Sequence, residues 1–475
     1  MSVREDFAKA QSKENRDRAL SDPYRLSYHI MPPVGWLNDP NGLYEKDGVY
    51  HIFYQYSPGS ADGSTPQGWG HYSTKDFITF EEEEVPLFPD QYMDAKGAYS
   101  GSAFPDGDTV HFFYTGNNKL ECDHDYINSG RIHWTNHFTT KDGKEFTEKE
   151  TLLKNEDYPE DMSNHVRDPK IIKEGDTYYM VLGARSKDNV GQILVFESKD
   201  LKNWKLSSRI LPEETFGFMW ECPDVFDLDE ERILITCPQG VDTDGIKYEN
   251  VYQNGYFLID DDLSKDQKVK DFAELDNGFD FYAPQTFLDE NGRRILIGWM
   301  GLPDAPYHNP KNVEYGWQHA LTLPRRLEFR NGRLYQYPIE ETLNLREKEV
   351  PMELKANKVE KLPSRVCEIN LDVDNKSFVL KLRKDVTISW DGKVMTLSLG
   401  ESGEGRDARH LAIEKVESLQ IFSDVSSLEI FVNKGEHAFT TRLFDEEDDL
   451  DIESDRDMKA TIWTLKAYTF KWQDA

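Results

Sequence analysis

The stretch Asp47-Gly-Val-Tyr-His-Ile-Phe-Tyr54 reads as a tight turn followed by an alternating strand, and similar stretches occur four more times in the chain. They begin at Asp106, Glu174, Asp229 and Glu290, so successive copies start about sixty residues apart. A second marker, Thr or Ser followed by Lys-Asp, recurs at positions 74, 140, 198 and 264 and indicates a turn between later strands. A unit of two hairpins repeated around an axis is a four-stranded propeller blade. The repeat therefore predicts a five-bladed β-propeller.

The rest of the chain sets the domain organisation, because 475 residues exceed one ordinary core. Residues 1–24 are charged on all sides and have helical composition, which predicts an N-terminal helical segment before a propeller spanning 25–337. Residues 338–350 are polar and Glu-rich and read as a linker. Residues 351–475 hold about six or more short alternating strands with turn signals, which predicts a β-sandwich of two antiparallel sheets. The expected fold class is all-β.

Charge and cysteine content exclude several classes of function. The chain carries 56 Lys and Arg against 88 Asp and Glu, a net charge of −32 that argues against affinity for nucleic acid or anionic membranes. Its four cysteines lack metal-binding spacing and read as free thiols of a reducing compartment. The N-terminus has no apolar signal segment and no apolar run is long enough to span a membrane, so we expect a cytoplasmic protein.

The repeat also locates candidate functional residues, because the residues just before each hairpin share the innermost strand and should face the central channel. In blade order these triplets are Asn38-Asp39-Pro40, Ser100-Gly101-Ser102, Arg167-Asp168-Pro169, Glu221-Cys222-Pro223 and Ala283-Pro284-Gln285. Taken alone, Asn38 to Gly42 is an ordinary turn sequence. Three carboxylates on one axis repel one another, however, and a purely structural site would not gather them without a metal or a chemical task.

Three converging carboxylates suit glycoside hydrolysis with retention, which needs a nucleophile and a protonated carboxyl group that serves as acid and then base. Glu221 lies between Trp220 and Cys222, an apolar setting that would favour a protonated general acid. Asp168 directly follows Arg167, whose charge would keep it ionised as a hydroxyl anchor or a stabiliser of the oxocarbenium ion. Asp39 is left as the nucleophile by exclusion, since spacing alone does not distinguish it from Asp168.

A set of motifs across the chain resembles glycoside hydrolase family 32, which comprises invertases, sucrose-6-phosphate hydrolases and fructan β-fructosidases. The motifs are Trp36-Leu-Asn-Asp-Pro-Asn-Gly, Tyr54-Gln-Tyr, Trp69-Gly-His, Tyr99-Ser-Gly-Ser, Arg167-Asp-Pro, Glu221-Cys-Pro, Asp280-Phe-Tyr-Ala-Pro-Gln, Gly298-Trp-Met-Gly and, in the tail, Leu428-Glu-Ile-Phe-Val-Asn. The resemblance implies Asp39 as nucleophile, Glu221 as acid and base, and Asp168 as transition-state stabiliser. It also implies a terminal β-fructosyl donor and no requirement for a metal or cofactor.

The same resemblance suggests which residues bind the sugar. Asn38, Gln55, Ser100 and Arg167 would hold the fructose hydroxyls, and Trp36, Trp69, Tyr282 and Trp299 would line the pocket. Burial in the core is an equally good reading of Trp69 and Trp299, because Trp is often largely buried. Many family members have a further Trp in the loop after Tyr56, whereas residues 57–66 here are small and Gly-rich, so the leaving-group side has its own shape.

Several alternatives remain open at this stage. A fructosyltransferase would differ only in whether a sugar or water intercepts the intermediate. An arabinan-cleaving propeller would use three acids with inversion of configuration. A carbohydrate-binding propeller without activity would have lost one of the three acids. Sucrose, sucrose 6-phosphate and short fructooligosaccharides all present the same fructosyl group, and a phosphate would need Lys, Arg or His side chains that the sequence does not place. A homo-oligomer is compatible with the sequence.

Overall fold

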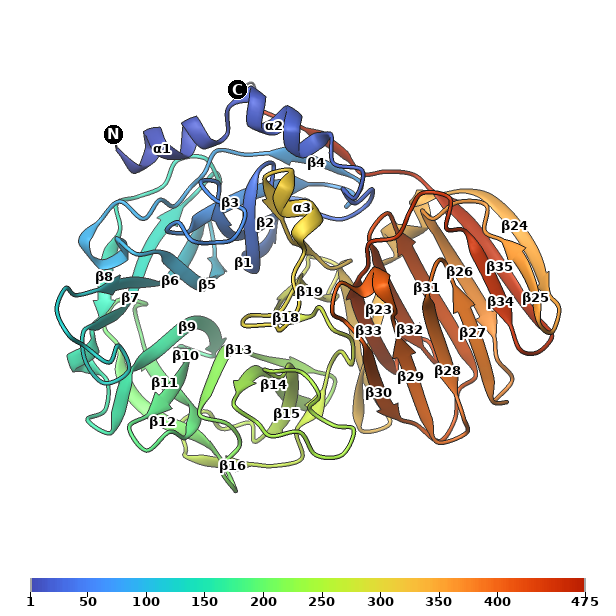
Figure 1. Ribbon diagram of the computed structural model, residues 1–475. Coiled ribbons are helices and arrows are strands. Elements are labelled where there is room, and N and C mark those ends of the chain that lie inside the picture. Colours follow the sequence, from blue (N-terminus) through green and yellow to red (C-terminus); the bar gives the residue numbers. More distant parts are fainter. Residues whose placement is uncertain (1, 474–475) are drawn as a thin grey trace.

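The computed structural model describes residues 2–473 and consists of a ring of blades beside a two-layered β domain (Figure 1). Five sheets surround the ring axis and two six-stranded sheets form the second domain. The all-β prediction of a five-bladed propeller followed by a sandwich is thereby confirmed. Among the described residues, no helix is long and apolar enough to cross a membrane.

The blades follow the chain in order, each with its first strand innermost (Figure 1). Blade 1 contains β1 (Gly35–Lys46), β2 (Val49–Ser57), β3 (Gly68–Thr74) and β4 (Thr79–Glu82); blade 2 contains β5 (Ala98–Asp106), β6 (Thr109–Lys119), β7 (Arg131–Thr140) and β8 (Glu150–Leu153). Blade 3 contains β9 (Met162–Glu174), β10 (Thr177–Ser186), β11 (Gly191–Ser198) and β12 (Lys205–Pro212), with β16 (Gln267–Val269) at its edge. Blade 4 contains β13 (Met219–Leu228), β14 (Glu231–Gln239), β15 (Gly255–Ile259) and β17 (Ala273–Glu274); blade 5 contains β18 (Tyr282–Leu288), β19 (Arg294–Met300), β22 (Arg325–Arg330) and β23 (Arg333–Pro338), with β21 (Ala320–Leu321) on β19.

The sandwich packs two antiparallel sheets against each other. One sheet runs in the order β24 (Arg346–Leu354), β35 (Met458–Leu465), β26 (Cys367–Asp372), β31 (Ser418–Asp424), β32 (Ser427–Val432) and β33 (His437–Arg442). The other runs β25 (Lys358–Lys361), β34 (Asp451–Ser454), β27 (Phe378–Leu382), β28 (Val386–Trp390), β29 (Val394–Ser398) and β30 (Ala408–Ala412). Strand β24 begins at Arg346, so the sandwich takes in the last residues of the expected linker.

Short helices and two added strands complete the fold. The helices are α1 (Val3–Ala10), α2 (Lys13–Leu20) and α3 (Pro310–Glu314), with 3-10 turns η1 (Tyr92–Asp94), η2 (Asn155–Asp157), η3 (Glu340–Leu345) and η4 (Glu401–Gly403). Strand β20 (Trp317–Gln318) joins β1, and β36 (Thr469–Lys471) returns from the sandwich to pair in parallel with β4. The last strand therefore ties the end of the chain to blade 1, next to α1 and α2 (Figure 1).

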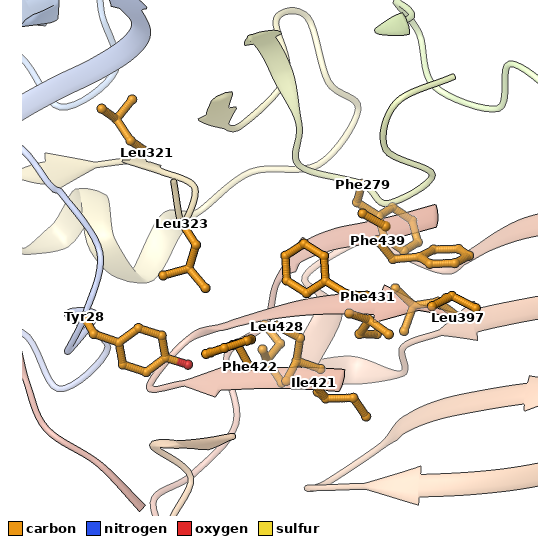
Figure 2. Packing of buried hydrophobic residues seen from close by; sticks show 14 of the residues in the cluster. Tyr28, Phe279, Leu321, Leu323, Leu397, Ile421, Phe422, Leu428, Phe431 and Phe439 are labelled. Atoms are coloured by element: carbon orange, nitrogen blue, oxygen red, sulfur yellow. The ribbon is translucent and has the colours of Figure 1, made fainter. Parts of the chain in front are cut away.

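The propeller and the sandwich share one hydrophobic core. Figure 2 shows Phe279 and Leu323 of the propeller side facing aromatic residues of the sandwich, including Phe431 and Phe439. Each of these four side chains is buried. Apolar burial of this kind stabilises the folded chain by about 25 cal/mol per Å². The shared core therefore fixes the sandwich against blade 5.

Buried ion pairs cross the same interface. Arg325 of β22 donates to Glu429 of β32 at 2.6 Å and to Asp276 at 3.1 Å. Arg406 of the sandwich donates to both carboxylate oxygens of Asp280 at 2.7 Å. Asp280 lies two residues before β18, so the sandwich fixes the start of the innermost strand of blade 5.

Candidate active site

Every innermost strand has an irregularity at the same level. The pairing register shifts between Leu37 and Pro40, between Ala98 and Gly101, between Glu221 and Asp224 and between Tyr282 and Gln285, and at the matching point of β9, opposite Val181 to Gly183. A bulge bends its strand and re-aims the side chains beside it. At these bulges Asp168, Cys222 and Ala283 adopt positive φ angles of 65°, 50° and 46°. Such angles are uncommon for residues other than Gly and are found at functional sites, where the surrounding structure enforces them.

The bulges direct their side chains into one cavity of about 570 Å³ at the ring axis. Asp39, Asp168 and Glu221 all line it, as do seven of the eight predicted binding residues: Trp36, Asn38, Gln55, Ser100, Arg167, Tyr282 and Trp299. In the fifth blade none of the expected triplet Ala283-Pro284-Gln285 lines the cavity. Tyr282 reaches the cavity, whereas Ala283 is buried and Gln285 donates to the carbonyl of Gly101 at 2.5 Å.

Trp69 is the predicted binding residue that does not line the cavity. Its side chain is fully buried and its ring packs against Tyr114 and Phe138 of blade 2. The indole nitrogen donates to the carbonyl of Tyr99 at 3.2 Å. Trp69 is on β3, the third strand from the axis, so its side chain meets the neighbouring blade instead of the channel. It supports the strand that carries Ser100.

Asp39 is held by donors on both carboxylate oxygens. The Ser100 hydroxyl donates to Oδ2, the Cys222 thiol approaches the same oxygen at 3.7 Å, and the Asn38 amide donates to Oδ1 at 3.1 Å. Asn38 in turn bonds Gln55, whose amide donates to Ser100 at 3.1 Å. Burial raises the pKa of Asp39 to about 6, with the Ser100 hydrogen bond opposing this rise and the charge of Glu221 adding to it.

Asp168 is 6% exposed and lies against the same segment of blade 4. Its Oδ2 accepts the backbone N–H of Cys222 at 2.9 Å, and Arg167 Nε is 4.0 Å from that oxygen. Burial raises the pKa of Asp168 to about 7, with the charge of Arg167 opposing the rise and that of Glu221 adding to it. We expected Arg167 to hold this group ionised, but desolvation outweighs the cation because the guanidinium faces a different carboxylate.

That carboxylate is Glu221, which is not in the apolar surroundings we expected. Arg167 donates to its Oε1 through Nε at 3.0 Å and Nη2 at 2.6 Å. Gln239 and Tyr282 each donate to Oε2 at 2.7 Å. The apolar neighbours in sequence point elsewhere: Trp220 is fully buried and stacks on Phe257. Alternation along the strand put the side chain of Glu221 on the polar side.

One wall of the cavity is cationic, and sequence reasoning missed it. Arg131 and His133 come from β7, His165 from β9 and Arg185 from β10, and all four line the cavity beside Arg167. His165 is two residues before Arg167, a spacing that places both side chains on one face of a strand. This spacing was the one feature of the sequence that could have predicted a residue of the wall. Arg131 and Arg185 belong to no motif, and only the packing of blades 2 and 3 brings them together.

Comparisons with known proteins identify the family of the chain. The family model described as the N-terminal domain of glycosyl hydrolases family 32 matches residues 29–338, and the model of the C-terminal domain of that family matches residues 339–469. A sucrose-6-phosphate hydrolase of Bacillus subtilis (strain 168) is 38% identical, over 94% of this chain and 95% of its own. One from Staphylococcus xylosus is 35% identical, over 98% and 97% respectively.

Solved structures give the same result. The structure of sucrose-6-phosphate hydrolase from Lactobacillus gasseri superimposes with a TM-score of 0.87 at 30% identity, covering 97% of each chain. A β-fructofuranosidase of family 32 from Bombyx mori superimposes with a TM-score of 0.83 at 30% identity, covering 97% of this chain and 98% of its own. Together with the two matching domain models, these similarities show that the chain is a glycosidase belonging to glycoside hydrolase family 32.

Proposed function

We propose that this glycosidase hydrolyses the β-fructofuranosyl bond of sucrose 6-phosphate with retention of configuration. Asp39 attacks C2 of the fructosyl group while Glu221 protonates the leaving oxygen, giving a fructosyl-enzyme and glucose 6-phosphate. Water that has lost a proton to Glu221 then releases fructose and frees Asp39. Asp168, one residue from Arg167 at the cavity wall, holds fructose hydroxyls and stabilises the oxocarbenium-like transition state.

The observation that carries the choice of substrate is the cationic wall. Among residues 2–473, neither Arg131 nor Arg185 has a carboxylate within 4.0 Å, although the chain has a net charge of −32. Arg131 bonds neutral groups, namely the oxygens of Tyr126 and Asn117 at 3.0 Å each and Nε2 of His133 at 3.3 Å. Arg185 bonds Asn189 and lies over the Phe218 ring at 4.6 Å. Two arginines without a counter-ion in an acidic protein indicate an anionic ligand.

The position of the wall next to Glu221 supports this choice. Arg167 contacts both Glu221, which would protonate the leaving oxygen, and His165 of the cationic wall. The glucosyl unit of the substrate is the leaving group, so its 6-phosphate would project from Glu221 toward this wall. The relatives named sucrose-6-phosphate hydrolase support the same choice, and the expected cytoplasmic location is compatible with a phosphorylated sugar.

A comparison of kcat/KM for sucrose 6-phosphate, sucrose and kestose tests the proposal. The wild type should prefer sucrose 6-phosphate. Because a hydrogen bond to a charged group contributes about 1.5–3 kcal/mol, Arg131→Met and Arg185→Met should each reduce that preference about 10- to 100-fold. Arg333→Met, on β23 outside the cavity, is the matched control and should leave the preference unchanged. Equal kcat/KM for sucrose and its 6-phosphate would refute the assignment.

A further inference from the structure

Arg167 connects Glu221 to the cationic wall. Its Nε and Nη2 face Oε1 of Glu221, while its Nη1 donates to Nδ1 of His165 at 2.7 Å. We propose that Arg167 is shared between Glu221 and the phosphoryl group of the substrate, with His165 positioning it, so that phosphoryl binding releases Glu221 to become protonated. This inference rests on the proposed substrate, because it assigns a role to the phosphoryl group beyond binding.

The starting point is the hydrogen bonding of Glu221 in the structure. Four donors from Arg167, Gln239 and Tyr282 reach its two oxygens at distances between 2.6 and 3.0 Å. These donors occupy acceptor positions on both oxygens of Glu221, and the guanidinium of Arg167 can only donate. A general acid must instead carry a proton when the leaving oxygen departs. At least one of these donors therefore has to turn away from Glu221 before its carboxyl group can carry the proton.

His165 has a fixed tautomer that suits it to hold Arg167. A carbonyl oxygen accepts only, so Nε2 of His165 donates to the carbonyl of Tyr126 at 3.0 Å. A guanidinium donates only, so Nδ1 accepts from Arg167 and His165 is neutral. Burial, followed by the charges of Arg167 and Arg131, lowers the pKa of His165 to about 3. Its lone pair thus keeps Nη1 of Arg167 turned toward the cationic wall.

The charges that act on His165 are the cations of Arg167, Arg131 and Arg185. Two tyrosines also lie there: Tyr126, whose carbonyl His165 bonds, and Tyr99, whose ring packs on His133. Arg131 and the ring of His133 face it from β7, Arg167 from its own strand, and Arg185 acts on it from β10. Arg131 is in the same crowded environment: burial lowers its pKa, Tyr99 opposes this fall, and the charge of Arg167 adds to it. A phosphoryl dianion placed here would relieve this repulsion and give Nη1 of Arg167 a stronger acceptor than an imidazole.

When the phosphoryl group binds, Arg167 changes its hydrogen-bond partner and Glu221 takes a proton from solvent. The guanidinium of Arg167 moves part of its hydrogen bonding from Glu221 to the phosphoryl oxygens, and the carboxylate of Glu221 takes up one proton from bulk water to become the carboxylic acid. No covalent bond is made or broken in this step. The phosphoryl group thereby raises kcat as well as binding, because its interaction prepares the transition state and not only the ground state.

The test is the pH dependence of kcat, whose basic limb reports loss of the proton from the general acid in the enzyme–substrate complex. In the wild type this limb should lie about one pH unit or more higher for sucrose 6-phosphate than for sucrose, equivalent to about tenfold in proton affinity. His165→Ala should remove most of that difference. His165→Gln, whose amide can both accept from Arg167 and donate to a carbonyl, should keep it, as should the control His410→Gln in the sandwich.

A second measurement needs no variant. Phosphite dianion added to a reaction with sucrose should raise kcat/KM several-fold in the wild type, because the charge occupies the cationic wall without being attached to the sugar. Identical basic limbs for the two substrates would overturn the coupling, and if sucrose 6-phosphate were still preferred through KM alone, the proposed function would stand without it. Equal kcat/KM values for the two substrates would overturn both. A shift that His165→Ala leaves intact would remove His165 from its positioning role.

Discussion

Replacing Arg406 by Met should destabilise the protein strongly, because it leaves a buried carboxylate without its cation. The side chains of Arg406 and Asp280 are each 1% exposed, and Arg406 supplies two of the three hydrogen bonds that Asp280 accepts, the third coming from the backbone N–H of Arg442 at 2.8 Å. Burial opposes ionisation of Asp280, but the charge of Arg406 keeps the pKa of Asp280 below its usual value. Asp280 is therefore a buried carboxylate ion, and the variant leaves it without its cation. Removing one partner of a buried pair costs about 3–5 kcal/mol.

Scanning calorimetry measures this effect as a fall in Tm of roughly 6–20 °C, at about 2–4 °C per kcal/mol for larger domains. The double variant Arg406→Met/Asp280→Leu should recover more than half of the loss, because the buried carboxylate that lost its cation is then removed as well. Lys355→Met, which removes an exposed ion pair on the surface of the sandwich, is the control and should leave Tm unchanged. A single variant as stable as the wild type, or a double variant no better than the single one, would refute the reasoning.

Three further predictions concern the site and its supports. Ser100→Ala should move the acid limb of kcat/KM up by about one pH unit, since the hydroxyl holds down the pKa of Asp39, which burial has raised to about 6; an unmoved limb in the pH profile would contradict this. Gly63→Ala should cost about 1–2 kcal/mol and raise KM, because φ is 71° there and a Cβ would lie 3.0 Å from the Trp36 indole; unchanged calorimetry and KM would show that the loop yields freely. Burial lowers the pKa of His29, but the hydrogen bonds that it donates to two sandwich carboxylates at 2.8 and 2.9 Å raise it overall, above the usual 6.5. The stability lost in His29→Asn should therefore be greatest below about pH 6.5 and shrink as pH rises through the folded-state pKa, and chemical unfolding that shows the reverse trend would contradict the assignment.

The fold could be predicted from the sequence because each blade repeats the same local sequence pattern. An acidic or Gly-containing turn followed by alternating apolar residues specifies a hairpin wherever it occurs, and five copies specify a ring. The bulges were not predictable in the same way, since nothing local marks one extra residue on one strand. In the fifth blade, accordingly, Tyr282 reaches the cavity and none of the predicted triplet Ala283-Pro284-Gln285 does.

The charge partners of the site residues could not be predicted, because they depend on the direction of each side chain. The identity of the adjacent residues in the sequence does not determine that direction. Glu221 was expected to be in an apolar setting because of Trp220, yet alternation along β13 sends the two side chains to opposite faces. Arg167 was expected to serve the adjacent Asp168, and it pairs instead with Glu221 across the blade boundary. Arg131 and Arg185 are 54 positions apart and on different blades, so their convergence exists only in the folded chain.

The central claim is that Asp39 becomes covalently bound to the fructosyl group, and a trapped intermediate tests it most directly. The variant Glu221→Ala lacks the base for the second step, so a fructosyl donor with an activated leaving group should accumulate as fructosyl-enzyme. Mass spectrometry of the peptides after acid quenching should find the added fructosyl mass on the peptide that contains Asp39. The same mass on the peptide that contains Asp168, or on neither, would contradict the account.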